Sequence, residues 1–104
     1  MRVWRQGDLY FARVTDVPDS AVLRRGTVLV HSARTGHSHE VFGVGRVRVL
    51  ESATVGDLFI AADGVVVILH EEHRALVLDA GVYRVWRQRQ HWPSRARDWA
   101  PHDD

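Results

Sequence analysis

Residues 63–88 read DGVVVILHEEHRALVLDAGVYRVWRQ, and this stretch decides the fold. Short runs of Val, Ile, Leu and aromatic residues alternate with turn-forming segments at Asp63-Gly64 and Asp79-Ala80-Gly81. Branched and aromatic side chains favour strands, whereas Gly and Asp favour the turns between strands. The sequence therefore predicts strands at Val65–His70, Ala75–Leu78 and Val82–Gln88.

The rest of the chain repeats this organisation. Turn signals at close spacing separate five further predicted strands, which are Leu9–Val14, Thr27–His31, His39–Phe42, Arg46–Leu50 and Asp57–Ala61. The chain holds 17 Val against eight Leu, which also favours strands over helices. Only Asp19–Arg25 is suited to a short turn of helix. We predict an all-β fold, a small antiparallel barrel or sandwich of about eight short strands.

The predicted strands differ in their patterns. Arg46-Val47-Arg48-Val49 alternates, which indicates one solvent-exposed face and one packed face. Val65–Leu69 is continuously apolar and is predicted to be covered on both faces. The string RVWRQ occurs at Arg2–Gln6 and again at Arg84–Gln88, and we interpret the two copies as similar edge strands.

Length and composition exclude several classes of protein. The 104 residues suffice for one domain, which we place at residues 1–90, followed by an extended tail at residues 91–104. Without Cys the chain has no disulfide, thiolate nucleophile or cysteine zinc site, and without Lys it has no lysine base. No apolar run reaches the about 20 residues needed to span a bilayer. We expect a cytoplasmic protein with no membrane partner.

Four of the seven histidines form two close pairs. His37 and His39 are two residues apart, so in an extended segment both side chains lie on the same face. A turn at Glu71-Glu72 would place His70 opposite His73 in a hairpin, with Cβ atoms about 5 Å apart. Four imidazoles suit one divalent metal ion, whether zinc, iron, manganese or nickel. The sequence therefore predicts a metal site made of His37, His39, His70 and His73, which are also the candidate catalytic residues.

A small β-domain with a His-x-His pair and a later strand containing Gly resembles the cupin barrels. In that family a first motif supplies two His and a Glu to a metal ion, and a second motif, Pro-x-Gly-x-x-His, supplies a third His. The resemblance implies His37, His39 and Glu40 for the first motif and Asp79–Arg84 for the second. Arg84 stands where the third His belongs, so the second histidine pair would have to replace it. The motifs Thr-Gly-His-x-His and His-Glu-Glu-His also look like those of small, uncharacterised bacterial proteins.

The distribution of charge supports a second hypothesis, nucleic-acid binding. Residues 80–97 contain five Arg and no acidic residue, although the formal net charge of the chain is only +1. Guanidinium groups bind phosphates and flat rings stack on bases, so this segment suits RNA or single-stranded DNA. The candidate residues are Arg84, Arg87, Arg89, Arg95, Arg97 and Trp92.

Three further interpretations remain open at this stage. The histidines and arginines together would suffice for acid–base cleavage of RNA without a metal. The chain could instead be a non-catalytic subunit that forms a homo-oligomer or joins a larger assembly through exposed sheet edges. Finally, paired histidines also occur as ordinary solvent-exposed turn residues with no function.

Overall fold

The computed structural model describes residues 2–52 and 56–87, and within these ranges the chain forms ten strands and no helix. The strands are β1 (Val3–Gln6), β2 (Leu9–Val14), β3 (Val22–Arg24), β4 (Val28–His31), β5 (Ser38–Gly43), β6 (Val47–Glu51), β7 (Leu58–Ala62), β8 (Val66–Leu69), β9 (Leu76–Leu78) and β10 (Gly81–Arg87). The predicted all-β class is confirmed, with ten strands in place of about eight.

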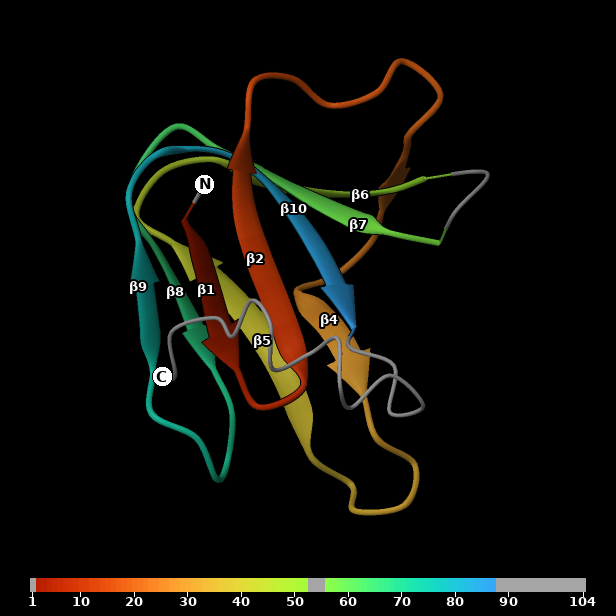
Figure 1. Cartoon of the computed structure of the whole chain (residues 1–104), viewed down its shortest axis with the longest axis vertical. Helices are drawn as coiled ribbons and strands as arrows, with labels where there is room; N and C mark the ends of the chain where they lie inside the picture. The colour runs from red at the N-terminus through yellow and green to blue at the C-terminus, as the bar shows by residue number, and fades with distance from the viewer. Residues whose placement is uncertain (1, 53–55, 88–104) are drawn as a thin grey trace.

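The strands form two antiparallel sheets that lie one in front of the other (Figure 1). The six-stranded sheet has the order β1-β2-β10-β7-β6-β3, and the four-stranded sheet has the order β4-β5-β8-β9. In the described residues no ladder joins one sheet to the other, so the sheets do not close into a barrel. Of the two architectures that the sequence allowed, the fold is the sandwich.

The main core lies between the two sheets. Its buried side chains come from both sheets and are Leu9, Phe11, Leu29, Val41, Val49, Leu58, Ile60, Val66, Ile68, Leu76, Leu78, Tyr83 and Val85. Burying a large apolar side chain contributes about 1.5–3 kcal/mol, so this layer supplies most of the stabilisation. The alternation predicted for Arg46–Val49 is confirmed, because Val49 is buried in this core, Val47 packs against it and Arg48 is exposed.

The segment predicted as a turn of helix is instead partly a strand. Val22–Arg24 forms β3, which pairs with β6 at the edge of the larger sheet. Ahead of it, Val17 and Ala21 pack against Leu50, Phe59 and Ala61 on the outer face of that sheet. The pairing with β6 supplies the backbone of this segment with partners that a single helical turn would not provide.

Two further predictions about strand position are wrong. β1 is an edge strand as predicted, but β10 lies between β2 and β7 in the interior of the larger sheet, so Arg84–Gln88 is not an edge. β8 is not covered on both faces either. Val66 and Ile68 are buried whereas Leu69 is 44% exposed, because only one face of the smaller sheet packs against the other sheet.

Several connections gather at one end of the sandwich, the lower end in Figure 1. They are the β1–β2 turn, the β4–β5 loop and the β8–β9 loop, together with the end of β10. Because antiparallel neighbours reverse direction, residues far apart in the sequence meet there. In the described part of the chain, no helix is long and apolar enough to cross a membrane.

Candidate functional site

The loops at this end bring the four predicted histidines together. His37 precedes β5, His39 lies on β5, and His70 and His73 lie in the β8–β9 loop. The ring centroid of His70 is 4.4 Å from that of His39, 4.6 Å from that of His73 and 5.5 Å from that of His37. The rings of His39 and His73 are nearly parallel, with centroids 6.3 Å apart. These four residues form the histidine cluster, with His70 at its centre.

The pairing of β5 with β8 joins the two histidine pairs. In this ladder Glu40 is opposite Leu69, and the same register continued by one residue sets His39 opposite His70. The predicted hairpin partnership of His70 with His73 is wrong in its geometry. The β8–β9 ladder ends at the pair Ile68–Leu76, so both histidines belong to the loop beyond it, and the long loop accommodates the adjacent glutamates that a tight turn disfavours.

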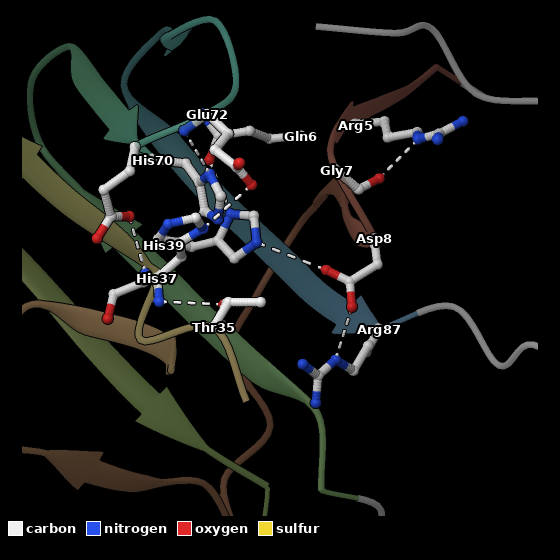
Figure 2. A network of polar contacts seen from close by, with 12 residues as sticks. Arg5, Gln6, Gly7, Asp8, Thr35, His37, His39, His70, Glu72 and Arg87 are labelled. Atoms are coloured by element: carbon white, nitrogen blue, oxygen red, sulfur yellow. Dashed lines mark hydrogen bonds and ion pairs between the residues drawn. The ribbon is translucent and has the colours of Figure 1, made fainter. Parts of the chain in front are cut away.

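The deepest member of the cluster, His39, is held by a buried glutamine. Gln6 has no exposed surface, and its Nε2 donates to the carbonyl oxygens of Ile68 at 2.8 Å and Arg74 at 3.0 Å. Its Oε1 lies 2.8 Å from Nδ1 of His39 (Figure 2). Because both amide hydrogens of Gln6 go to carbonyl groups, Oε1 accepts and Nδ1 of His39 donates. This bond fixes the tautomer of His39 and leaves the lone pair on Nε2.

Nε2 of His39 faces a carboxylate. It lies 3.5 Å from Oδ1 of Asp8, whose Oδ2 accepts a hydrogen bond of 2.9 Å from Nε of Arg87 (Figure 2). Burial alone would raise the pKa of the Asp8 carboxyl. The hydrogen bond and charge of Arg87, helped by the charge of His39, outweigh burial and hold this pKa below its usual value. Asp8 is therefore a carboxylate at neutral pH.

The cluster disfavours its own protonation. Burial, followed by the positive charge that His70 would carry, lowers the pKa of His39 to about 4, although Asp8 opposes the shift. Burial and then the charge of His73 also lower the pKa of His70. At neutral pH these two rings are therefore uncharged, with one ring nitrogen of each carrying a lone pair.

The two glutamates of the HEEH motif attach the β8–β9 loop to the segment around β5. Oε1 of Glu71 accepts a hydrogen bond of 2.9 Å from the backbone N–H of Ser38, and this bond is the main reason that the pKa of Glu71 is lowered. Oε1 of Glu72 lies 3.1 Å from Nδ1 of His37. The backbone N–H of Glu72 donates to Nδ1 of His70 at 3.1 Å. The glutamates thus position both loops and orient two of the four imidazoles.

A glycine in the β1–β2 turn completes the wall of the cluster. Gly7 has φ +62°, a conformation that other residues adopt only with strain. A Cβ at this position would lie 2.6 Å from Nε2 of His73, so only glycine allows the turn to approach the ring so closely. The sequence alone does not connect Gln6, Gly7 and Asp8 with the histidines. No local pattern marks a contact between residues more than 30 positions apart.

The cluster forms one wall of an open cleft of about 700 Å³. Arg5, Arg34 and Arg87 line the cleft together with Asp8 and Glu72. Hydroxyl groups of Ser32 and Thr35 also border it, and Val30 is the one apolar side chain among the lining residues that the structure describes. A cleft of this character suits a polar, charged ligand.

In their observed positions, the four histidine side chains do not form a coordination sphere for a metal ion. In residues 2–52 and 56–87, no group of three or more His, Asp or Glu side chains could hold a metal ion without rearrangement. One reason is visible at His70, whose Nδ1 accepts the N–H of Glu72, so that the proton of the neutral ring is on Nε2. Metal binding at His70 would require this ring to rotate or to exchange its tautomer.

The predicted nucleic-acid residues are only partly within the described chain. Arg84 makes an ion pair of 2.5 Å with Asp57 and covers the ring of Trp86, whereas Arg87 pairs with Asp8 at the cleft. Arg89, Arg95, Arg97 and Trp92, like the predicted tail at residues 91–104, lie outside the described residues. The two described arginines therefore serve different ion pairs.

Glu40 and Arg84, which the cupin resemblance adds to His37 and His39, make their contacts elsewhere. Glu40 accepts a hydrogen bond from the hydroxyl of Thr27. Arg84, at the position of the third cupin histidine, donates a hydrogen bond through Nε to the carboxylate of Asp57. The pair His37 and His39 meets the β8–β9 loop instead.

Comparison with known proteins gives a match to one family. A family model with the description "Domain of unknown function (DUF8820)" matches residues 5–88, a range that includes all ten strands except the first two residues of β1. No curated protein and no solved structure matches the chain.

Proposed function

The chain belongs to the family described as Domain of unknown function (DUF8820), and we propose that it binds one divalent transition-metal ion at the histidine cluster. The observation that carries the proposal is the meeting of four imidazoles from two distant segments, with centroid distances of 4.4–5.5 Å from the central ring of His70. Metal–nitrogen bonds of about 2.1 Å put two imidazoles on one tetrahedral ion at a centroid separation of about 5 Å. The spacing of the three rings around His70 is therefore close to that of a bound set, whereas His39 and His73, with centroids 6.3 Å apart, would have to move closer together.

The contact between His39 and Asp8 supports the same proposal. A neutral His39 that donates through Nδ1 to Gln6 directs the lone pair of Nε2 at a carboxylate oxygen 3.5 Å away. Two electron-rich atoms facing each other repel unless a cation lies between them. Two ligand atoms on a tetrahedral ion with bonds of about 2.1 Å are about 3.4 Å apart, which is close to this separation. Asp8 is therefore a further candidate ligand.

Gln6 supplies the outer support that metal-binding histidines have in proteins. Such histidines commonly donate their second ring N–H to a carbonyl or carboxylate oxygen, which orients the ring. His39 donates to Gln6, and Nδ1 of His37 is within hydrogen-bonding distance of Glu72. Both arrangements direct Nε2 away from its supporting residue and make it available as a ligand.

The lowered pKa values favour metal binding at neutral pH. A metal ion competes with protons for histidine nitrogens, so a ring that is already neutral binds without displacing a proton. The pKa of His39 is about 4 and that of His70 is also lowered. Neutral imidazoles and one carboxylate suit zinc, iron(II), manganese or nickel.

The proposal is tested with the full 104-residue chain purified without a histidine tag. Zinc titration by calorimetry should give one site per chain. His39→Gln should weaken zinc binding by at least about 100-fold, because even the loss of an outer supporting residue costs 10–100-fold. His31→Gln is the matched control, since His31 bonds to Ser38 outside the cluster and should leave the affinity unchanged. Absence of zinc binding, or equal losses in both variants, would overturn the proposal.

The hydrogen bonds of the cluster support a second candidate, proton transfer without a metal ion. His39 offers a lone pair on Nε2, whereas His70, which accepts from Glu72, has its proton on Nε2. Two neighbouring imidazoles of opposite tautomer can act as base and acid toward one substrate. The zinc titration separates the two candidates, because only the metal proposal requires a zinc-binding site that is lost in His39→Gln.

A further inference from the structure

The cleft beside the histidine cluster carries an excess of positive charge. Its lining includes Arg5, Arg34 and Arg87 against the carboxylates of Asp8 and Glu72, which leaves a net charge of +1 when the histidines are neutral. A divalent ion at the cluster would raise this to +3. A partly enclosed cleft concentrates such a field, so its natural ligand is an anion.

Two of these arginines are fixed in place by hydrogen bonds. Nε of Arg87 donates to Asp8 at 2.9 Å, and Nε of Arg5 donates to the carbonyl oxygen of Gly7 at 2.7 Å. For Arg87 this bond occupies one edge of the guanidinium group and orients the rest. A preoriented guanidinium loses little entropy when it binds an oxyanion.

The third arginine, Arg34, has no hydrogen-bond or ion-pair partner among the described residues. It lies on the β4–β5 loop, which is closed by hydrogen bonds between Ser32 and His37 at 2.9 Å and between Gly36 and Ser32 at 2.8 Å. The loop that carries Arg34 therefore leads directly into His37 of the cluster. Arg34 is a cation at the cleft whose charge nothing in the described chain neutralises.

We propose that the cleft binds a phosphate ester, with the phosphoryl oxygens between the bound metal ion and the guanidinium groups of Arg34 and Arg87. The inference rests on the proposed function, because the ion supplies two of the positive charges. A guanidinium group can bind two phosphate oxygens at once through two parallel N–H donors. A site of charge +3 also suits a dianion better than a monoanion. The volume of about 700 Å³ also leaves room for an organic group.

The lining indicates the character of that organic group. Among the described lining residues, Val30 is the one apolar side chain and imidazoles are the only rings, so this part of the chain gives the cleft neither a hydrophobic pocket nor a large aromatic surface for stacking. Hydroxyls of Ser32 and Thr35 can hydrogen-bond to other hydroxyls. A small polar phosphate, such as a phosphorylated sugar, fits this chemistry.

The test uses methylphosphonate, a stable phosphate analogue, titrated by calorimetry into zinc-loaded and metal-free wild-type protein at about pH 8.5, where the probe is mainly a dianion. Arg34→Gln should weaken binding to the zinc-loaded protein by about tenfold or more, because it removes a charged hydrogen-bond donor. Its zinc affinity should stay within twofold of wild type. Arg25→Gln is the matched control, since Arg25 is an exposed arginine outside the cleft and should change neither affinity.

The outcomes separate this inference from the metal proposal. If zinc does not bind but methylphosphonate still binds in a manner that depends on Arg34, the metal proposal fails and the anion site stands. If Arg34→Gln and Arg25→Gln behave alike, or if no methylphosphonate binds in either state, the anion site is overturned. Acetate that binds as tightly as methylphosphonate would overturn the assignment to phosphate.

Discussion

The imidazoles of His39 and His70 lie with their centroids 4.4 Å apart, although 31 positions separate them in the chain. The contact is a consequence of strand register, because β5 and β8 are paired with Glu40 opposite Leu69 and the next residues are the two histidines. Each histidine pair by itself is a local feature, His37 and His39 around the start of β5 and His70 and His73 in the β8–β9 loop. Their meeting across a ladder, above the buried Gln6, is what makes a site.

The first prediction concerns Gln6. Gln6→Met keeps most of the volume but removes the hydrogen bonds to the carbonyl groups of Ile68 and Arg74 and takes away the acceptor of the Nδ1–H of His39. Because each unsatisfied buried group costs about 1–3 kcal/mol, we expect the free energy of unfolding to fall by about 3 kcal/mol. Urea denaturation of the metal-free protein measures this. A loss below 1 kcal/mol would mean that water replaces the glutamine.

Gln6→Met should also weaken zinc binding in protein that remains folded. Without its acceptor, His39 can exchange its tautomer, and loss of an outer supporting residue costs about 10–100-fold in metal affinity. Calorimetry at a temperature well below the unfolding transition separates this effect from the loss of stability. Unchanged zinc affinity would show that Gln6 serves the fold alone.

The second prediction concerns the pH dependence of stability in the metal-free protein. The pKa of His39 is about 4 in the folded chain against about 6.5 in an unfolded one, so between these values the unfolded chain binds more protons. The free energy of unfolding should therefore fall as the pH is lowered from 6.5 to 4, by about 2 kcal/mol after allowing for screening in the open cleft. Urea denaturation across this range measures the slope.

Two variants assign this slope to its residue. His39→Gln removes the titrating group and should flatten the dependence between pH 4 and 6.5. His31→Gln, which changes an exposed histidine on β4, should keep it. A slope that survives in His39→Gln would show that His39 is not its source and would point to the other groups with lowered pKa values, which are His70, Glu71 and Asp8.

Local sequence patterns predicted the bounds of the strands better than they predicted which strands are adjacent in each sheet. Val, aromatic and turn residues located Leu9–Val14 to the residue and most other strands to within one or two positions. The position of β10 inside its sheet depends on β2 and β7, which are distant in the sequence, so RVWRQ could not reveal it. Val22–Arg24 becomes a strand only because β6 offers it partners.

In the candidate site, too, local spacing was predictable from the sequence, whereas long-range contacts were not. The two-residue repeat of an extended strand linked His37 with His39, and the short spacing in the sequence linked His70 with His73. The four residues could therefore be proposed from the sequence. The β5–β8 register that unites them is a long-range property. Gln6 was beyond sequence reasoning for another reason, since a polar residue on an edge strand is ordinarily exposed and here is fully buried.

The third prediction compares Gly7 and Gly26, two glycines of positive φ that differ in their surroundings. Gly7→Ala places a methyl group 2.6 Å from Nε2 of His73, whereas Gly26→Ala meets nothing within 4 Å. Both substitutions incur the left-handed backbone strain of about 1–2 kcal/mol. Only Gly7→Ala should displace His73, so it alone should weaken zinc binding. Equal zinc affinities in the two variants would remove His73 from the site.

The last prediction decides whether Asp8 belongs to the metal site. Asp8→Asn keeps the shape of the side chain but removes the charge that faces His39 and that pairs with Arg87. If Asp8 is a ligand, zinc affinity should fall by at least about tenfold, because a neutral amide is a much weaker ligand than a carboxylate. Calorimetric titration of zinc into the folded variant measures this.

Asp57→Asn is the control for Asp8→Asn, because Asp57 forms a comparable ion pair with Arg84 away from the cleft and should leave zinc affinity unchanged. A second control addresses Arg87, which is released when Asp8 loses its charge. Arg87→Gln removes the same ion pair but keeps the carboxylate, so it should leave zinc bound at least as tightly as in wild type. If Asp8→Asn and Arg87→Gln weaken zinc binding equally, the ion pair matters only for the shape of the cleft, and the metal site consists of histidines alone.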